Sequence, residues 1–75
     1  MNITILGAGA WGTALGIHFA KHNHPIAMWT HNAEHAQTMQ QSRENERYLP
    51  NFRLPDNLNV YADMSEALRD SELVL

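Results

Sequence analysis

Apolar and polar positions along the chain follow two alternating periods, which predicts strands and helices in turn. The first apolar run, residues 3–6, is short and rich in β-branched side chains, so we expect a buried strand. From Trp11 to about Asn23 the spacing becomes helical. The apolar stripe of this helix is expected to consist of Ala14, Leu15, Phe19 and Ala20.

The same succession follows Pro25, which ends the first helix. Residues 26–29 predict a second strand, and Asn32 is placed to cap a helix that runs to about Ser42. This helix has only a weak apolar face, so we expect it to cover one edge of the fold. The face consists of Ala33, Ala36, Met39 and Gln40.

Residues 44–57 lose all periodicity and contain two prolines, so a loop of about 14 residues is expected, a length usually kept for function. Residues 58–61 alternate like a strand with one buried face. Asp63 and Glu66 have the spacing of a capping box, which starts a short helix to about Asp70. Residues 72–75 begin another buried strand, and we therefore expect the chain to be part of a longer protein.

Composition narrows the classes of function. The chain has 75 residues, 44% of them apolar, and a mean hydropathy of −0.41, as expected of one small globular domain. Five basic against eight acidic residues give a net charge of −3, which disfavours nucleic-acid binding. The absence of cysteine excludes disulfides and thiolate metal sites. The apolar stretch 5–20 is interrupted by glycines, so no membrane span is expected, and we place the chain in the cytoplasm.

The sharpest motif is the segment Gly7-Ala8-Gly9-Ala10-Trp11-Gly12, a G-x-G-x-x-G between the first strand and the first helix. In a dinucleotide site Gly7 makes the tight turn, Gly9 lets a pyrophosphate approach the backbone, and Gly12 lets the helix pack closely on the sheet. Backbone N–H groups around Ala10 and Trp11 then face the phosphates. The alternative is a glycine-rich turn in an unrelated α/β protein. With its strand–helix–strand context the motif predicts a Rossmann-type α/β fold, a doubly wound parallel sheet in the order β-α-β-α-β-α-β.

The end of the second strand bears on which dinucleotide binds. Sites that prefer NAD usually carry an acid there, but this chain reads Thr30-His31-Asn32. A carboxylate would repel a 2′-phosphate, whereas Thr30 and His31 can donate hydrogen bonds to it. We therefore expect NADP or NAD, with NADP preferred. The alternative for His31 is a solvated loop histidine.

Other residues that could bind a ligand or a metal give less specific signals. The Trp11 indole either packs over the cofactor or belongs to the core. His18 and His22 have the i, i+4 spacing of metal ligands but no glutamate partner on their helix, so no metal site is expected. No arrangement for nucleophilic or paired-carboxylate catalysis is present, and we expect no catalytic residue within the chain.

Residues 7–16, Gly-Ala-Gly-Ala-Trp-Gly-Thr-Ala-Leu-Gly, resemble the N-terminal loop of the bacterial NAD(P)-dependent glycerol-3-phosphate dehydrogenases. The resemblance extends over the whole chain through Met28-Trp29-Thr30-His31, the segment Asn45-Glu46-Arg47-Tyr48-Leu49-Pro50 and the unit from Leu54 to Leu68. Ala10 departs from the family pattern, which usually has Ser, and a hydroxyl contact to phosphate is lost with it.

The resemblance implies that residues 1–75 are the N-terminal part of a dinucleotide-binding domain, with the rest of that domain and the substrate domain outside the chain. It implies reversible reduction of dihydroxyacetone phosphate to sn-glycerol 3-phosphate for phospholipid synthesis, a small phosphorylated substrate and a homodimer in the full-length protein. Cofactor contacts are implied for Gly7, Gly9, Ala10, Trp11, Gly12, His31 and Tyr48. The alternative for Tyr48 is a loop anchor packed on the sheet. Two alternative functions are a ketopantoate or 6-phosphogluconate-type dehydrogenase and a non-catalytic nucleotide-binding module.

Overall fold

The computed structural model describes residues 1–75 and contains a four-stranded parallel sheet in the order β5-β2-β1-β6. The strands are β1 (Ile3–Leu6), β2 (Ile26–Trp29), β5 (Leu58–Tyr61) and β6 (Leu73–Val74). The helices are α1 (Ala10–Lys21), α2 (Ala33–Ser42) and α3 (Met64–Leu68). The alternation of strands and helices and the parallel sheet confirm the expected doubly wound architecture.

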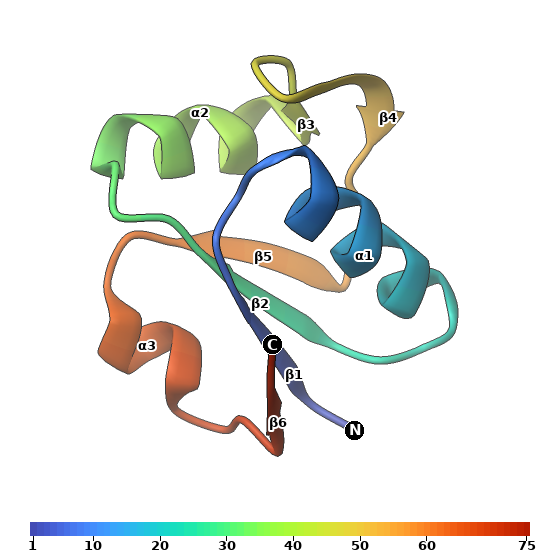
Figure 1. Cartoon of the computed structure of the whole chain (residues 1–75), viewed down its shortest axis with the longest axis vertical. Coiled ribbons are helices and arrows are strands. Elements are labelled where there is room, and N and C mark those ends of the chain that lie inside the picture. Colours follow the sequence, from blue (N-terminus) through green and yellow to red (C-terminus); the bar gives the residue numbers. More distant parts are fainter.

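The helices lie on both faces of the sheet. Figure 1 shows α1 and α2 on one side and α3 on the other. Strand order explains this arrangement, because the chain moves outward from β1 to β2 and β5 and then returns past β1 to β6, while each crossover stays right-handed. The direction in which successive strands are added to the sheet therefore reverses next to β1. In doubly wound sheets ligands bind in the crevice beyond the carboxyl ends of the strands at such a switch point.

The core lies between the sheet and α1, and it depends on a glycine. A Cβ added to Gly16 would lie 2.9 Å from Met28 Cε and 3.2 Å from both Ile5 Cδ1 and Leu58 Cδ1. The helix axis can thus come close to three strands, and Met28 and Leu58 are completely buried. The expected stripe of α1 is partly wrong. The buried face consists of Thr13, Gly16, Ile17 and Ala20, while Leu15 and Phe19 are half-buried at its margin and Ala14 is exposed.

Helix α2 covers the edge strand β5, as its weak apolar face predicts. Ala36 and Met39 are buried there, but Ala33 is exposed. Gln40 is not part of an apolar face. Its side chain accepts from Val60 N–H at 2.8 Å and donates to Asn59 Oδ1 at 2.9 Å, so it satisfies the open edge of β5.

The segment expected to be a loop contains a small antiparallel sheet. β3 (Glu44–Asn45) pairs with β4 (Leu49–Arg53), and this hairpin lies beside α1 and α2 (Figure 1). Arg43, in the left-handed region at φ 58°, closes the base of the hairpin. Its guanidinium donates to the carbonyl oxygens of Pro55 and Leu58, both at 2.6 Å, and its own carbonyl accepts from Leu54 N–H at 2.7 Å.

Two helix caps agree with the sequence pattern. Asn32 Oδ1 accepts from His35 N–H at 3.0 Å, and Asp63 Oδ1 accepts from Ser65 N–H at 2.8 Å. The capping box at Asp63 is only half formed, because the structure has no bond from Asp63 N–H to the Glu66 carboxylate. None of the helices combines the length and the apolar character that crossing a membrane requires.

Candidate functional site

The glycine segment leaves the carboxyl end of β1 and enters α1 directly. Gly7 has φ +132°, a conformation that side-chain-bearing residues rarely adopt, and its N–H donates to Trp29 O at 2.8 Å. The turn is therefore tied to the end of β2. Helix α1 begins at Ala10, one residue earlier than expected, with Gly9 as its N-cap.

Gly9 and Gly12 play different structural parts. A Cβ on Gly9 would meet nothing within 4 Å, so this position faces open space. A Cβ on Gly12 would lie 2.6 Å from Gly7 O, inside van der Waals contact with backbone. Gly12 thus permits the close packing of helix on loop, and Gly9 leaves room outside the backbone. Both observations agree with the separate parts that the dinucleotide motif assigns to these glycines.

The first turn of α1 offers unused backbone donors. The first hydrogen bond of the helix runs from Thr13 N–H to Gly9 O at 3.0 Å. The N-cap residue, Gly9, has no side chain that could accept from the N–H groups of the first turn. The N–H groups of Ala10, Trp11 and Gly12 precede that bond and have no partner within the helix. The first turn contains no acidic residue. The positive end of a 12-residue helix and its free donors are well suited to a phosphate.

Trp11 is not a core residue. Its side chain is 81% exposed at the start of α1. The interpretation that a helix-start aromatic packs into the core is therefore wrong for this position. The indole lies on the surface beside the glycine turn, where an aromatic ring is available to a ligand.

A pocket of about 460 Å³ joins the glycine turn to the end of β2. Its walls come from the turn, from the β2–α2 connection and from the tip of the hairpin. The lining residues are Gly7, Ala8, Gly9, Trp29, Thr30, His31, Asn32, His35, Arg47 and Tyr48. Five of the ten were not selected from the sequence, whereas Gly7, Gly9, Thr30, His31 and Tyr48 were. The lining contains no Asp or Glu.

The two donors expected after β2 differ in accessibility. His31 is exposed, and its ring centroid lies 6.3 Å from that of Trp29. Thr30 is buried, and its Oγ1 accepts from Asn32 N–H at 3.4 Å. Both residues line the pocket, with His31 exposed and Thr30 largely buried in its wall, so donation by the Thr30 hydroxyl to a ligand stays a prediction.

Tyr48 lies at the hairpin tip and lines the same pocket as the glycine turn. Its side chain is 44% exposed, so it is not an anchor packed on the sheet. The ring centroid lies 5.6 Å from that of His35, and the Arg47 guanidinium carbon lies 5.2 Å from the ring centre. The hairpin thus brings an aromatic ring and a cation to the glycine turn.

Asn45 holds this arrangement together and was missed from the sequence. The residue is completely buried, and its Nδ2 donates to Ala8 O and to Thr13 Oγ1, both at 2.8 Å. Its Oδ1 lies 3.1 Å from His35 Nε2 and accepts from Tyr48 N–H at 3.3 Å. One side-chain amide therefore links the glycine turn, α1, α2 and the hairpin. Asn45 opens the segment Asn45–Pro50, but an asparagine in a proline-containing stretch gives no sign of burial.

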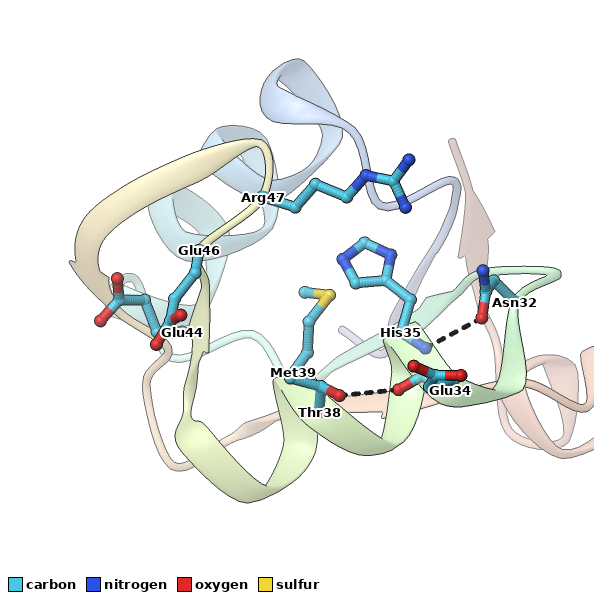
Figure 2. Close-up of a pocket in the computed structure, with 8 residues that line it drawn as sticks. All are labelled: Asn32, Glu34, His35, Thr38, Met39, Glu44, Glu46 and Arg47. Atoms are coloured by element: carbon cyan, nitrogen blue, oxygen red, sulfur yellow. Dashed lines mark hydrogen bonds between the residues drawn. The ribbon is translucent and has the colours of Figure 1, made fainter.

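A second pocket of about 450 Å³ lies on the other side of His35, between α2 and the hairpin. Figure 2 shows Arg47 reaching toward His35 and Asn32, with Glu44 and Glu46 on the opposite side. Three glutamates, Glu34, Glu44 and Glu46, line this pocket. This pocket is therefore less suited to an anion than the one beside the glycine turn.

The histidines of α1 do not form a metal cluster. His22 Nδ1 lies 2.8 Å from the His18 carbonyl oxygen, which uses one ring nitrogen for a helix-end contact. Nowhere in the structure do three His, Cys, Asp or Glu side chains gather as ligands would.

Comparison with known proteins agrees with the geometry of the turn. Residues 2–75 match the family model described as the NAD-dependent glycerol-3-phosphate dehydrogenase N-terminus. A protein named glycerol-3-phosphate dehydrogenase [NAD(P)+] from Neisseria gonorrhoeae strain NCCP11945 is 53% identical over all 75 residues, which correspond to 23% of that protein. The protein of the same name from Nitrosomonas eutropha is 48% identical over all 75 residues and 22% of its own length.

Solved structures show the same relationship. The crystal structure of glycerol-3-phosphate dehydrogenase from Coxiella burnetii superimposes with a TM-score of 0.93 at 37% identity, over 97% of this chain and 22% of that one. The enzyme from Plasmodium falciparum gives a TM-score of 0.82 at 28% identity, over 99% of this chain and 23% of that one. The chain thus spans less than a quarter of the relatives it matches. These matches decide between the dehydrogenase families considered above, and the chain belongs to the NAD-dependent glycerol-3-phosphate dehydrogenase family, to whose N-terminal part it corresponds.

Proposed function

We propose that this chain is the N-terminal part of the cofactor-binding domain of a NAD(P)-dependent glycerol-3-phosphate dehydrogenase. The protein of which it is part would interconvert sn-glycerol 3-phosphate and dihydroxyacetone phosphate and so supply glycerol 3-phosphate for phospholipid synthesis. When bound, the nicotinamide carries the hydride. The observation that carries the proposal is the glycine turn itself, with Gly9 facing open space at the free N-terminus of α1.

Each residue of the turn has a defined contribution to holding the dinucleotide. Gly7 turns the chain, Gly12 keeps α1 against the turn, and Gly9 leaves space for the pyrophosphate. The N–H groups of Ala10 and Trp11 donate to its oxygens. Trp11 offers its exposed indole to the cofactor, and Tyr48 adds a ring from the hairpin.

The residues around the pocket favour NADP over NAD. No carboxylate lines the pocket, and the exposed His31 follows β2, where NAD-preferring sites carry an acid. A ribose 2′-phosphate would meet no carboxylate in the lining of this pocket and would find a donor in the imidazole. NAD retains every contact to the pyrophosphate, so both cofactors bind and NADP binds more tightly.

A fluorescence titration of the chain with NADPH and with NADH tests this proposal, with Trp11 and Trp29 as reporters. We expect saturable quenching by both and a lower dissociation constant for NADPH. The matched variants are Gly9→Ala and Ala14→Gly. Gly9→Ala introduces a methyl group where the structure has open space at φ −78°, so the fold is kept while affinity falls about tenfold, or 1.4 kcal/mol.

Ala14 is exposed on α1 away from the pocket, so Ala14→Gly changes helix stability and leaves affinity unaltered. Unchanged affinity in Gly9→Ala would show that the turn does not hold the pyrophosphate. Turnover of glycerol 3-phosphate by the whole protein separates the dehydrogenase from a non-catalytic nucleotide-binding module. Size-exclusion chromatography of the whole protein tests the implied homodimer.

A further inference from the structure

The two neighbouring pockets differ sharply in charge. The pocket beside the glycine turn has no acidic residue in its lining, whereas Glu34, Glu44 and Glu46 line the adjoining one. Asn32, His35 and Arg47 border both. Of these two pockets, only the one beside the glycine turn has no acidic side chain in its lining, and Arg47 is its only Lys or Arg.

The other basic side chains are engaged or lie elsewhere. Arg43 donates to two carbonyl oxygens at the base of the hairpin, and Arg53 lies 3.9 Å from Asp56. Lys21 ends α1 and Arg69 caps α3, and neither lines the glycine-turn pocket. Arg47 is exposed and makes no ion pair or hydrogen bond within the chain. Its five N–H donors are therefore available to a ligand.

The guanidinium of Arg47 is positioned by the aromatic ring of Tyr48. It lies 5.2 Å from the centre of the Tyr48 ring, an arrangement that is attractive and limits its freedom. Tyr48 is in turn fixed by its N–H bond to the buried Asn45 amide and by its contact with His35. Figure 2 shows the guanidinium directed away from Glu44 and Glu46, toward His35 and Asn32.

We propose that Arg47 is a specificity-determining residue that pairs with the 2′-phosphate of NADP(H). The inference rests on the proposed function and adds a cationic contact to the hydrogen bond expected of His31. A guanidinium fork matches phosphate oxygens in pairs, which a neutral imidazole does not. The pyrophosphate has its own donors at the start of α1. Arg47 lines the pocket together with His31, at the end of β2, where dinucleotide sites read the adenosine ribose.

The test is titration of the chain and its variants with NADPH and NADH, together with competition by 2′-AMP and 5′-AMP. Arg47→Gln is expected to weaken NADPH binding about tenfold, as loss of a charge-assisted bond implies, and NADH binding by less than about twofold. The NADPH affinity of Arg47→Lys should lie between those of the wild-type chain and Arg47→Gln. Arg53→Gln is the matched control, an exposed arginine of the same hairpin outside the pocket, and should change neither affinity.

The positioning by Tyr48 is tested in the same assay. Tyr48→Phe keeps the ring under Arg47 and should keep the NADPH preference, whereas Tyr48→Leu removes the ring and should reduce it. Competition by 2′-AMP should weaken in Arg47→Gln while competition by 5′-AMP stays unchanged. Because Arg47 is exposed, its substitution leaves the core intact, which circular dichroism will verify.

Two results would overturn the inference while leaving the proposed function standing. An equal loss of NADPH and NADH affinity in Arg47→Gln would place the guanidinium on the shared pyrophosphate. Unchanged affinity for both NADPH and NADH would show that Arg47 does not contact the cofactor. A wild-type chain that is folded and binds neither nucleotide would instead refute the proposed function, and with it the assignment of Arg47.

Discussion

The side-chain amide of Asn45 donates to the carbonyl oxygen of Ala8 at 2.8 Å, across 37 positions of sequence. Since a carbonyl oxygen only accepts, the contact fixes which side of the amide is nitrogen. Oδ1 must then face His35 Nε2 at 3.1 Å, so that ring nitrogen carries a proton. The glycine turn and the hairpin are thus joined by one buried, fully hydrogen-bonded group.

Asn45→Ala is expected to destabilise the chain by about 2–3 kcal/mol, because Ala8 O, Thr13 Oγ1 and Tyr48 N–H lose a buried partner. Urea unfolding followed by circular dichroism measures the change in the free energy of unfolding. Gln37→Ala, an exposed amide on α2, is the control and should change stability by less than about 0.5 kcal/mol. Equal effects of the two would mean that the Asn45 contacts do not stabilise the fold.

Asn45→Asp tests the orientation of the amide. This variant keeps the shape of the side chain but places a carboxylate oxygen against Ala8 O, so two acceptors face each other in a buried position. We expect the free energy of unfolding at neutral pH to fall at least as far as in Asn45→Ala. A milder loss in Asn45→Asp would argue that donation from Asn45 Nδ2 to Ala8 O contributes little to stability.

Close approach of α1 to the glycine turn and to the sheet leads to a further prediction. In Gly12→Ala the new Cβ would lie 2.6 Å from Gly7 O, a backbone atom that moves only if the turn moves. In Gly16→Ala the closest atom, at 2.9 Å, is Met28 Cε, the flexible end of a side chain. We expect a loss of about 1–3 kcal/mol in the free energy of unfolding for Gly12→Ala and a smaller loss for Gly16→Ala.

The same urea unfolding measurement ranks the two variants, and nucleotide titration adds an independent readout. Gly12→Ala should also weaken NADPH binding because it displaces the glycine turn, whereas Gly16 faces the core and its substitution should leave affinity unchanged. The reverse order of stabilities would contradict the packing of α1 described above.

Sequence pattern predicted the sheet and the glycine turn because both depend on local signals. Strand runs, the caps at Asn32 and Asp63 and the G-x-G-x-x-G each act within a few residues. The buried face of α1 could not be predicted in this way. Where a helix touches a sheet closely, small residues such as Thr13 and Gly16 are buried, and an apolar stripe drawn through Leu15 and Phe19 points to the margin.

The hairpin and Asn45 escaped prediction for a different reason. Residues 44–53 contain proline and asparagine, which are typical of loops, and β3 is only two residues long. Their pairing is stabilised by contacts far along the chain, such as Arg43 with Leu58 and Asn45 with Ala8. No pattern within a short window reports such contacts. The cation and the ring that the hairpin brings to the pocket were therefore visible only in the structure.

The half-formed capping box at α3 predicts unequal effects of its two acids. Asp63→Ala removes an oxygen that accepts from Ser65 N–H at 2.8 Å, and we expect a loss of about 1 kcal/mol in the free energy of unfolding. Glu66→Ala removes no hydrogen bond in the structure and should cost less than about 0.5 kcal/mol. Thermal unfolding of both variants measures the difference. Equal losses would indicate that the reciprocal Glu66 bond does form.

The two tryptophans differ in exposure, which makes the contact proposed for Trp11 measurable. Trp11 is 81% exposed, whereas Trp29 is half-buried and its indole N–H donates to Ala62 O at 2.9 Å. In Trp29→Phe, iodide should quench the remaining Trp11 strongly, and NADPH should protect it. In Trp11→Phe, iodide should quench Trp29 weakly. If NADPH left the iodide quenching of Trp11 unchanged, the indole would not cover the cofactor, and binding would depend on the backbone of the turn and on the hairpin side chains.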